Sequence, residues 1–66
     1  MSVQDLPPSA KLVLKVLEVE GAHKKGELVE CTGLPESTAR YAAETLVEEG
    51  VVEKRLSDGE VVYDLV

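Results

Sequence analysis

The stretch Thr32-Gly33-Leu34-Pro35 interrupts the chain between two segments with helical patterns. Gly33 suits the left-handed backbone conformation that commonly ends a helix, and Pro35 is favoured in the first turn of a new one. Leu34, between them, offers an apolar side chain that can be buried at the turn. The stretch therefore predicts a tight turn that joins two helices packed on a common core.

The helix after this turn is expected from Pro35 or Glu36 to Glu49, with Gly50 ending it. On a helical wheel its apolar side chains gather on one face, which is typical of a helix half-buried in a core. This face carries Ala39, Ala42, Ala43, Leu46 and Val47, and the opposite face carries Ser37, Arg40, Tyr41, Glu44 and Glu48. The sequence thus predicts one side packed inward and one polar side left for contacts.

An earlier helix is expected from Ala10 to Glu20, with Pro7 and Pro8 before it, Ser9 as its N-cap and Gly21 at its end. Its apolar residues form two facets. The facet facing the core carries Ala10, Val13, Leu14 and Leu17, and the second carries Leu12, Val16 and Val19. The second facet is explained either by packing within the same chain or by a dimer interface.

A short helix is expected from Lys25 to Cys31, with Leu28 and Val29 as its buried residues. Gly26 weakens it, and Lys24 is a poor N-cap residue, so the sequence leaves its start open.

The end of the chain changes from a helical period to the period of two that is typical of strands. We expect strands at Val51–Leu56 and Glu60–Val66, joined by a two-residue turn at Asp58-Gly59, which is a strong hairpin signal. Such a turn places opposite each other the pairs Leu56 and Val61, Lys54 and Tyr63, Val52 and Leu65, and Glu53 and Asp64. The last pair sets like charges together, which is a mild penalty unless salt or a neighbouring cation relieves it.

The order of these elements predicts an α+β winged helix-turn-helix fold, with three helices followed by a two-stranded antiparallel hairpin, the wing. The 66 residues suffice for one domain, which we place at residues 7–66 after a flexible leader at residues 1–6. A domain this small has little apolar material for an enclosed substrate pocket beside its core.

The charge balance is strongly acidic, with 13 acidic residues, 7 basic residues and a net charge of −6. On average such a chain repels a polyanion. The acidic residues are dispersed along the chain, which suggests a very salty cytoplasm, where a Debye length of about 3 Å at molar salt mutes the repulsion.

The single cysteine excludes an internal disulfide and a multi-cysteine zinc site, and it fits a reduced intracellular setting. The start of the chain lacks a secretory signal, and no apolar run approaches the roughly 20 residues that span a bilayer. We therefore expect a cytoplasmic protein without a membrane partner.

Four segments resemble those of small archaeal winged-helix regulators related to the MarR group, above all those of salt-loving archaea. They are Leu6–Val13, Thr32–Pro35, Ser37–Ala42 and Leu46–Arg55. The resemblance covers nearly the whole chain from Leu6 onward. It implies the winged fold and a role in transcription regulation, and it supplies neither a target sequence nor an effector.

In a helix-turn-helix, the second helix of the pair enters the major groove of DNA, so the helix at about residues 36–49 is the expected recognition helix. Arg40 is the only base on its outward face and suits guanine or a phosphate, although a surface ion pair with Glu44 is the plain alternative. Ser37 and Thr38 lie in the first turn, near phosphates or base edges, but Thr38 fits a half-buried packing position equally well. Tyr41 suits a phosphate or a thymine methyl group, and Glu44 is a weaker candidate that could accept from a cytosine amino group.

Four further bases are expected beside the DNA backbone: Lys24 and Lys25 at the short helix, and Lys54 and Arg55 on the wing strand. Each alone is better explained as a solvated surface charge. With Arg40 they place five of the seven bases on the expected DNA side. The acidic wing turn, Ser57–Glu60, argues against insertion of the wing tip into the minor groove.

We therefore expect a sequence-specific regulator that binds double-stranded DNA, and we expect a homodimer that reads a two-fold site. The alternative is a winged-helix module that has become a protein-interaction domain, which the acidic surface favours. An enzyme is not expected, because His23 and Cys31 are the only such reactive residues and a dyad needs a third group and a pocket. We expect no cofactor, metal or small-molecule substrate, with His23 in an exposed loop and Cys31 acting as a small apolar residue.

Overall fold

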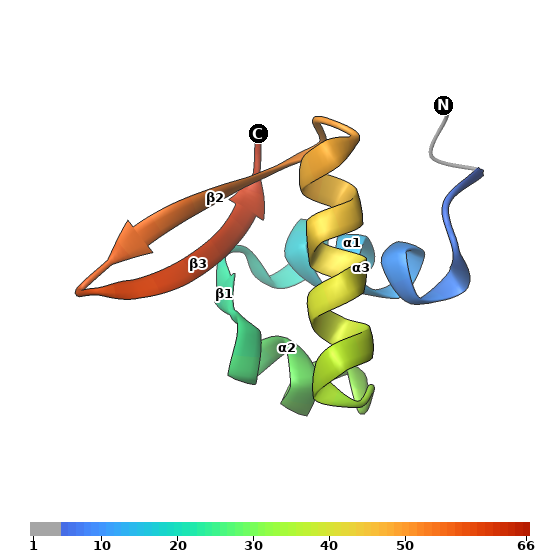
Figure 1. The fold of residues 1–66 in the computed structure, drawn as a ribbon, viewed down its shortest axis with the longest axis horizontal. Helices are drawn as coiled ribbons and strands as arrows, with labels where there is room; N and C mark the ends of the chain where they lie inside the picture. Colours follow the sequence, from blue (N-terminus) through green and yellow to red (C-terminus); the bar gives the residue numbers. More distant parts are fainter. Residues whose placement is uncertain (1–4) are drawn as a thin grey trace.

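The computed structural model describes residues 5–66, which form three helices and a three-stranded sheet (Figure 1). The elements are α1 (Pro8–Glu20), β1 (His23–Lys24), α2 (Lys25–Thr32), α3 (Glu36–Glu48), β2 (Val52–Ser57) and β3 (Glu60–Leu65). Figure 1 shows β2 and β3 as a long hairpin that projects away from the helical body, with α3 crossing in front of α1. The predicted winged helix-turn-helix fold is confirmed, with one strand more than expected.

Helix α1 begins two residues earlier than the sequence indicated. Its N-cap is Pro7, and Lys11 donates its backbone N–H to the carbonyl of Pro7 at 3.1 Å. Pro8 takes the first helical position, where a fixed φ is favourable and a missing N–H costs nothing. The prediction of Ser9 as N-cap was therefore wrong, because Ser9 already lies inside the first turn.

The two apolar facets of α1 have different surroundings. Every residue of the predicted core facet is buried, and Val16 of the second facet is buried as well. Leu12 and Val19 stay 41% and 68% exposed. Packing within the chain thus accounts for only part of the second facet. The core also takes in Leu6, which is 5% exposed and which we had placed in the leader; residues 1–4 of that leader lie outside the described residues.

The turn between α2 and α3 has the predicted geometry. Gly33 adopts a left-handed conformation with φ 72°. The hydroxyl of Thr32 donates to the carbonyl of Leu28 at 2.6 Å and accepts from the N–H of Leu34 at 3.2 Å. Leu34 packs against the core as expected. The Thr32 side chain thus ties the last turn of α2 to the residue that follows Gly33.

The start of α2 is stabilised from within the helix. The carboxylate of Glu27 accepts the backbone N–H of Lys24 at 2.7 Å, which is the bond that the third helical residue makes in a capping box. Leu28 is fully buried and Val29 is half-buried.

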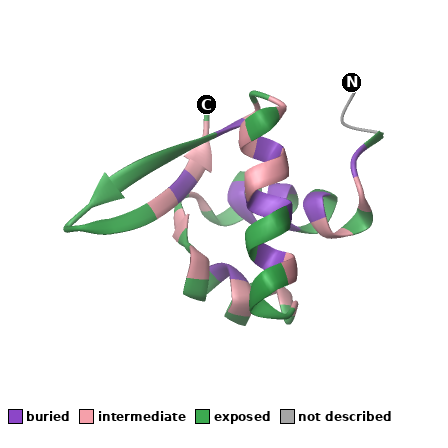
Figure 2. Cartoon of the chain, in the orientation of Figure 1, coloured by how far each residue is buried: buried purple, intermediate pink, exposed green. Residues whose placement is uncertain are grey.

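Helix α3 packs on α1 through small side chains. Ala39, Ala42, Ala43 and Leu46 are all 0% exposed. Alanine lets two helix backbones approach closely, so leucines of the neighbouring helices fill the core instead. Figure 2 shows the buried positions gathered where the helices meet and at the base of the hairpin, while the outer half of the hairpin is exposed.

The hairpin has the predicted register, with all four expected pairs opposite each other. Asp58 and Gly59 have φ values of 52° and 79°, which fit the primed turn that two-residue hairpins favour. The like-charged pair Glu53 and Asp64 is relieved by Arg55, whose guanidinium lies 2.7 Å from Asp64 and 3.8 Å from Glu53. A neighbouring cation thus removes the penalty at this position.

Strand β1 was not predicted. His23 pairs with Tyr63 and Lys24 with Val62, so the sheet order is β1-β3-β2. The expectation of an exposed loop at His23 was wrong, because this residue is half-buried and on a strand. Two residues are too few to give a periodic pattern, and the strand forms because the outer edge of β3 lies beside them. Within the described part of the chain, no helix is long and apolar enough to span a membrane.

Candidate nucleic-acid interface

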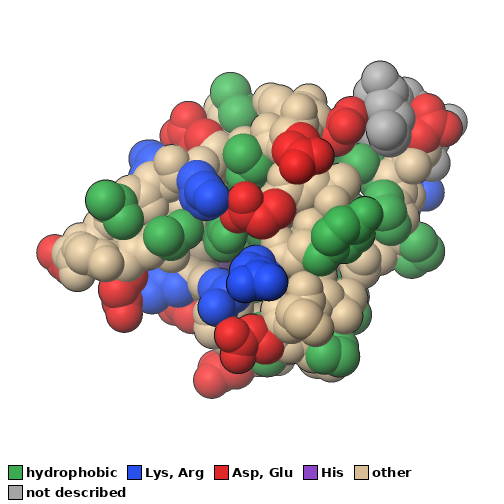
Figure 3. Space-filling model, viewed as in Figure 1, with side chains coloured by type: hydrophobic (Ala, Val, Ile, Leu, Met, Phe, Trp, Pro, Cys, Tyr) green, Lys and Arg blue, Asp and Glu red, His purple; other side chains and the backbone are tan. Residues whose placement is uncertain are grey.

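A groove of about 840 Å³ lies between α3, the start of α2 and the sheet. Its basic lining residues are Lys24, Lys25, Arg40 and Lys54, and its acidic ones are Glu27, Glu30, Glu44 and Glu60. Figure 3 shows basic and acidic side chains side by side on this face. Four of the five bases that the sequence placed on the DNA side therefore meet in one groove, without Arg55, and carboxylates are interspersed among them.

Arg40 differs from the other bases of the groove. It is exposed on α3, and within residues 5–66 it makes no ion pair or side-chain hydrogen bond. The alternative ion pair with Glu44 is not formed. Its guanidinium is therefore available to an external partner.

The remaining bases of the predicted site are paired with carboxylates of the chain. The pairs are Lys24 with Glu60, Lys25 with Glu36 at 3.0 Å, Lys54 with Glu44 at 3.1 Å, and Arg55 with Asp64 at 2.7 Å. Exposed ion pairs contribute about 0–1 kcal/mol each, so a phosphate can replace such a carboxylate at little cost. The groove is thus neutralised from within and can exchange these partners.

The pKa shifts in the groove follow these pairs. The hydrogen bond from Lys25, and then the charge of Lys25, hold the pKa of Glu36 below its ordinary value. The hydrogen bond and charge of Glu60 raise the pKa of Lys24. Both shifts favour the charged forms, so these pairs persist at neutral pH.

Glu44 is anchored between α3 and the sheet. The hydroxyl of Tyr63 donates to Glu44 Oε2 at 2.6 Å, and Lys54 Nζ donates to both carboxylate oxygens at 3.1 Å. These hydrogen bonds, that of Tyr63 first, lower the pKa of Glu44. Burial, together with the hydrogen bond to Glu44, raises the pKa of Tyr63 to about 12. Glu44 therefore holds the recognition helix to the wing and is committed to partners within the chain.

Tyr63 was missed as a site residue because its partner is distant in sequence. The predicted register did place Tyr63 opposite Lys54, and the wheel placed Glu44 on the outer face of the helix. Combining these two expectations would have brought the three side chains together.

The other predicted contact residues are not among those that line the groove. Ser37 and Tyr41 are exposed on α3, Tyr41 by 63%, while Thr38 is half-buried. Arg55 lies on β2 and is outside the groove lining. The structure thus brings together Lys24, Lys25, Arg40, Glu44 and Lys54, with Ser37, Thr38 and Tyr41 on the same helix as Arg40.

A protein-family model described as the IclR helix-turn-helix domain matches residues 12–56. A comparison with curated protein sequences finds no match.

Three solved structures have the same fold. BpsR of Bordetella bronchiseptica, whose DNA binding is regulated by 6-hydroxynicotinic acid, is 22% identical and superposes with a TM-score of 0.87 over 96% of this chain and 47% of its own. A MarR family transcriptional regulator from Silicibacter pomeroyi is 24% identical, with a TM-score of 0.85 over 96% of this chain and 44% of its own. The Zalpha domain of Carassius auratus PKZ, solved in complex with Z-DNA, is 19% identical, with a TM-score of 0.79 over 88% of this chain and 92% of its own.

This chain spans less than half the length of the first two proteins. The resemblance to MarR-related regulators therefore holds at the level of the fold, and the matched sequence model is the IclR type.

Proposed function

Because the chain belongs to the family of IclR helix-turn-helix domains, we propose that it is the DNA-binding domain of a transcription regulator and reads double-stranded DNA with α3. The observation that carries this proposal is the groove between α3 and the wing, lined by the guanidinium of Arg40, which forms no ion pair within residues 5–66. The similar BpsR structure, from a protein with regulated DNA binding, and the similar Zalpha structure, a complex with Z-DNA, support the same partner.

The dimensions of α3 suit the major groove. Its 13 residues make a helix about 20 Å long, and the major groove of B-form DNA is about 12 Å wide and admits a helix. In this arrangement Arg40 reaches guanine or a phosphate with its planar fork of donors. Ser37, in the first turn, offers a hydroxyl to the adjacent backbone.

The ion pairs of the groove set the remaining contacts. Lys24, Lys25 and Lys54 release Glu60, Glu36 and Glu44 when phosphates take their place. Each exchange makes one lysine available to a phosphate without any change in fold. Glu44 is the counter-ion of Lys54 before DNA binds, and it keeps its hydrogen bond from Tyr63 after Lys54 has released it.

We further propose that the regulator is a homodimer. Leu12 and Val19 on α1 and Val66 at the end of the chain are exposed by 41%, 68% and 79%. Apolar side chains at such positions are available for burial against a second copy. Two copies would double the few phosphate contacts and match a two-fold site. The net charge of −6 fits a cytoplasm of high salt, where repulsion from DNA is screened.

The experiment is a fluorescence-anisotropy titration of labelled mixed-sequence duplex at several salt concentrations. Arg40→Ala is compared with Lys15→Ala, which removes an exposed base of α1 outside the groove. We expect saturable binding, a loss on the order of tenfold for Arg40→Ala, and a salt slope that falls by about 1. Lys15→Ala should stay within about twofold of wild type.

Absence of binding from low to near-molar salt, with circular dichroism showing a folded domain, would refute the proposal. It would favour the protein-interaction module instead. An equal loss for Arg40→Ala and Lys15→Ala would refute the role of the groove.

A further inference from the structure

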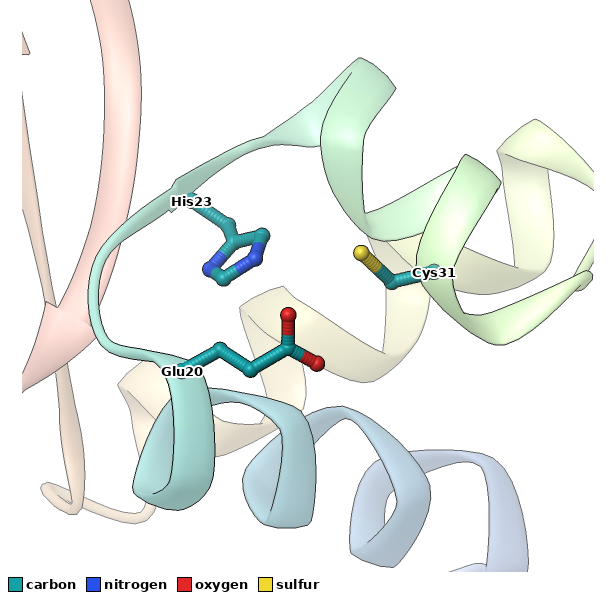
Figure 4. Close-up of side chains that lie close together, drawn as sticks. All are labelled: Glu20, His23 and Cys31. Atoms are coloured by element: carbon teal, nitrogen blue, oxygen red, sulfur yellow. The ribbon is translucent and has the colours of Figure 1, made fainter.

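A second cluster of reactive side chains lies apart from the groove, and none of its three residues lines that groove. It consists of Glu20 at the end of α1, His23 on β1 and Cys31 on α2. A carboxylate oxygen, an imidazole nitrogen and the thiol sulfur all lie within 4.8 Å of one another. Figure 4 shows the three side chains pointing towards a common space.

The imidazole of His23 is oriented for ligation. Nδ1 lies 2.7 Å from the carbonyl oxygen of Gly21. Because a carbonyl oxygen only accepts, Nδ1 carries the proton and Nε2 is left with its lone pair. A ligating histidine typically donates its other ring N–H in this way, which fixes the tautomer and the ring orientation.

The spacing of the donor atoms is close to that of a bound zinc ion. Zn–S and Zn–N distances of about 2.3 and 2.0–2.1 Å place tetrahedral ligand atoms about 3.5 Å apart. A set of atoms within 4.8 Å closes to this spacing by movements of about 1 Å. Glu20 and Cys31 are exposed and can make such rotations without disturbing the core.

We propose that Glu20, His23 and Cys31 form a single-chain site for a divalent zinc ion. One sulfur, one nitrogen and one oxygen ligand suit this borderline-soft metal better than Mg²⁺ or Ca²⁺, which prefer oxygen. Three protein ligands leave the fourth tetrahedral position to water. Binding converts the Cys31 thiol to a thiolate bonded to zinc and releases its proton to solvent.

The electrostatic surroundings support a cation here. Burial raises the pKa of the Cys31 thiol, and the charges of Glu20, Glu27 and Glu30 raise it further. The same carboxylates that disfavour an isolated thiolate attract a divalent cation. A bound cation would displace the thiol proton and supply the positive charge that these carboxylates lack.

The three ligand residues come from three different elements, α1, β1 and α2. An ion there would fasten the end of α1 and β1 to α2. Lys24 and Lys25 directly follow His23, so binding would also fix the chain that carries two bases of the groove. Zinc should therefore raise the thermal stability of the domain, whether or not DNA is present.

The test uses Co²⁺ as a spectroscopic probe and Zn²⁺ as its competitor. Because the chain has one cysteine and one histidine, a thiolate-to-cobalt absorption band reports Cys31 and a shifted imidazole resonance reports His23. We expect one equivalent of Co²⁺ to produce the band, Zn²⁺ to abolish it, and Zn²⁺ but not Mg²⁺ to raise the Tm by at least about 5 °C.

Variants assign the ligands. Cys31→Ser and Glu20→Gln change exposed side chains and should preserve the fold. Loss of a residue that only orients a metal ligand lowers metal affinity roughly 10- to 100-fold, and loss of either ligand should lower zinc affinity by more than this. Glu18→Gln removes the same charge from the same helix and should leave affinity within about twofold. The proposal fails if the folded domain gives no thiolate band, or if Glu20→Gln and Glu18→Gln weaken binding equally. It also fails if light scattering shows that the metal binds only between two copies.

Discussion

The hydrogen bond from Tyr63 to Glu44 links the recognition helix to the wing, so its removal should weaken the whole domain. Tyr63 is 3% exposed, and its hydroxyl lies 2.6 Å from a carboxylate oxygen. A hydrogen bond to a charged group is worth about 1.5–3 kcal/mol. The Glu44 side chain is 38% exposed, so water can replace the lost donor, and Tyr63→Phe should cost about 1.5 kcal/mol, the lower end of this range.

For a domain of this size such a loss lowers the Tm by about 6 to 12 °C. Urea unfolding followed by circular dichroism measures the free energy, and the slope with urea should stay constant because the fold is unchanged. Tyr41→Phe is the matched control: Tyr41 is 63% exposed, and its change should stay within about 0.5 kcal/mol. Equal stabilities of Tyr63→Phe and wild type would refute the anchoring role of this bond.

Three further predictions follow from individual residues. The pKa values of Glu36 and Glu44 lie below their ordinary 4.5, so the stability that these carboxylates contribute is present above about pH 4.5 and is lost as the pH falls through the lowered values. The urea midpoint should therefore be lower at pH 3 than at pH 6, and Glu44→Gln should reduce this difference. Gly33→Ala forces a side chain into a φ of 72° and should destabilise the domain by about 1–2 kcal/mol. Gly26→Ala, inside α2 with nothing near the added Cβ, should instead stabilise it by about 0.5–1 kcal/mol. Thermal melts that show no difference between the two variants would contradict the geometry of the turn. Glu44→Gln should also raise duplex affinity severalfold in anisotropy titrations, because it frees Lys54, and a loss of affinity would instead mark Glu44 as a base-reading residue.

The hairpin and the helix faces were predictable because they depend on local patterns. Asp58-Gly59 specified a two-residue turn, and the period of two then determined every pair along β2 and β3. The alanines of α3 occupied one face of the wheel and are buried. Enough apolar residues recur along this segment to define a helical period.

The remaining features depend on contacts between distant segments. β1 has two residues and exists only because the edge of β3 is beside it. The partners Tyr63 and Glu44 are 19 positions apart, and Glu20 meets Cys31 only after α1 and α2 have packed. The pairing of the lysines was equally hidden, since a charge in a sequence does not reveal its counter-ion. The sequence therefore located the candidate interface without revealing which of its bases are paired with carboxylates.

The most direct test of the central claim is amide chemical-shift mapping of the labelled domain with duplex DNA at low salt. We predict that the signals of residues 36–41 on α3, of Lys24–Gly26 and of Lys54 change together and saturate. The polar stripe of α1, which carries Lys11 and Lys15 outside the groove lining, should remain unchanged. Changes confined to α1, or no change at all in a folded domain, would contradict the assignment of this groove to DNA.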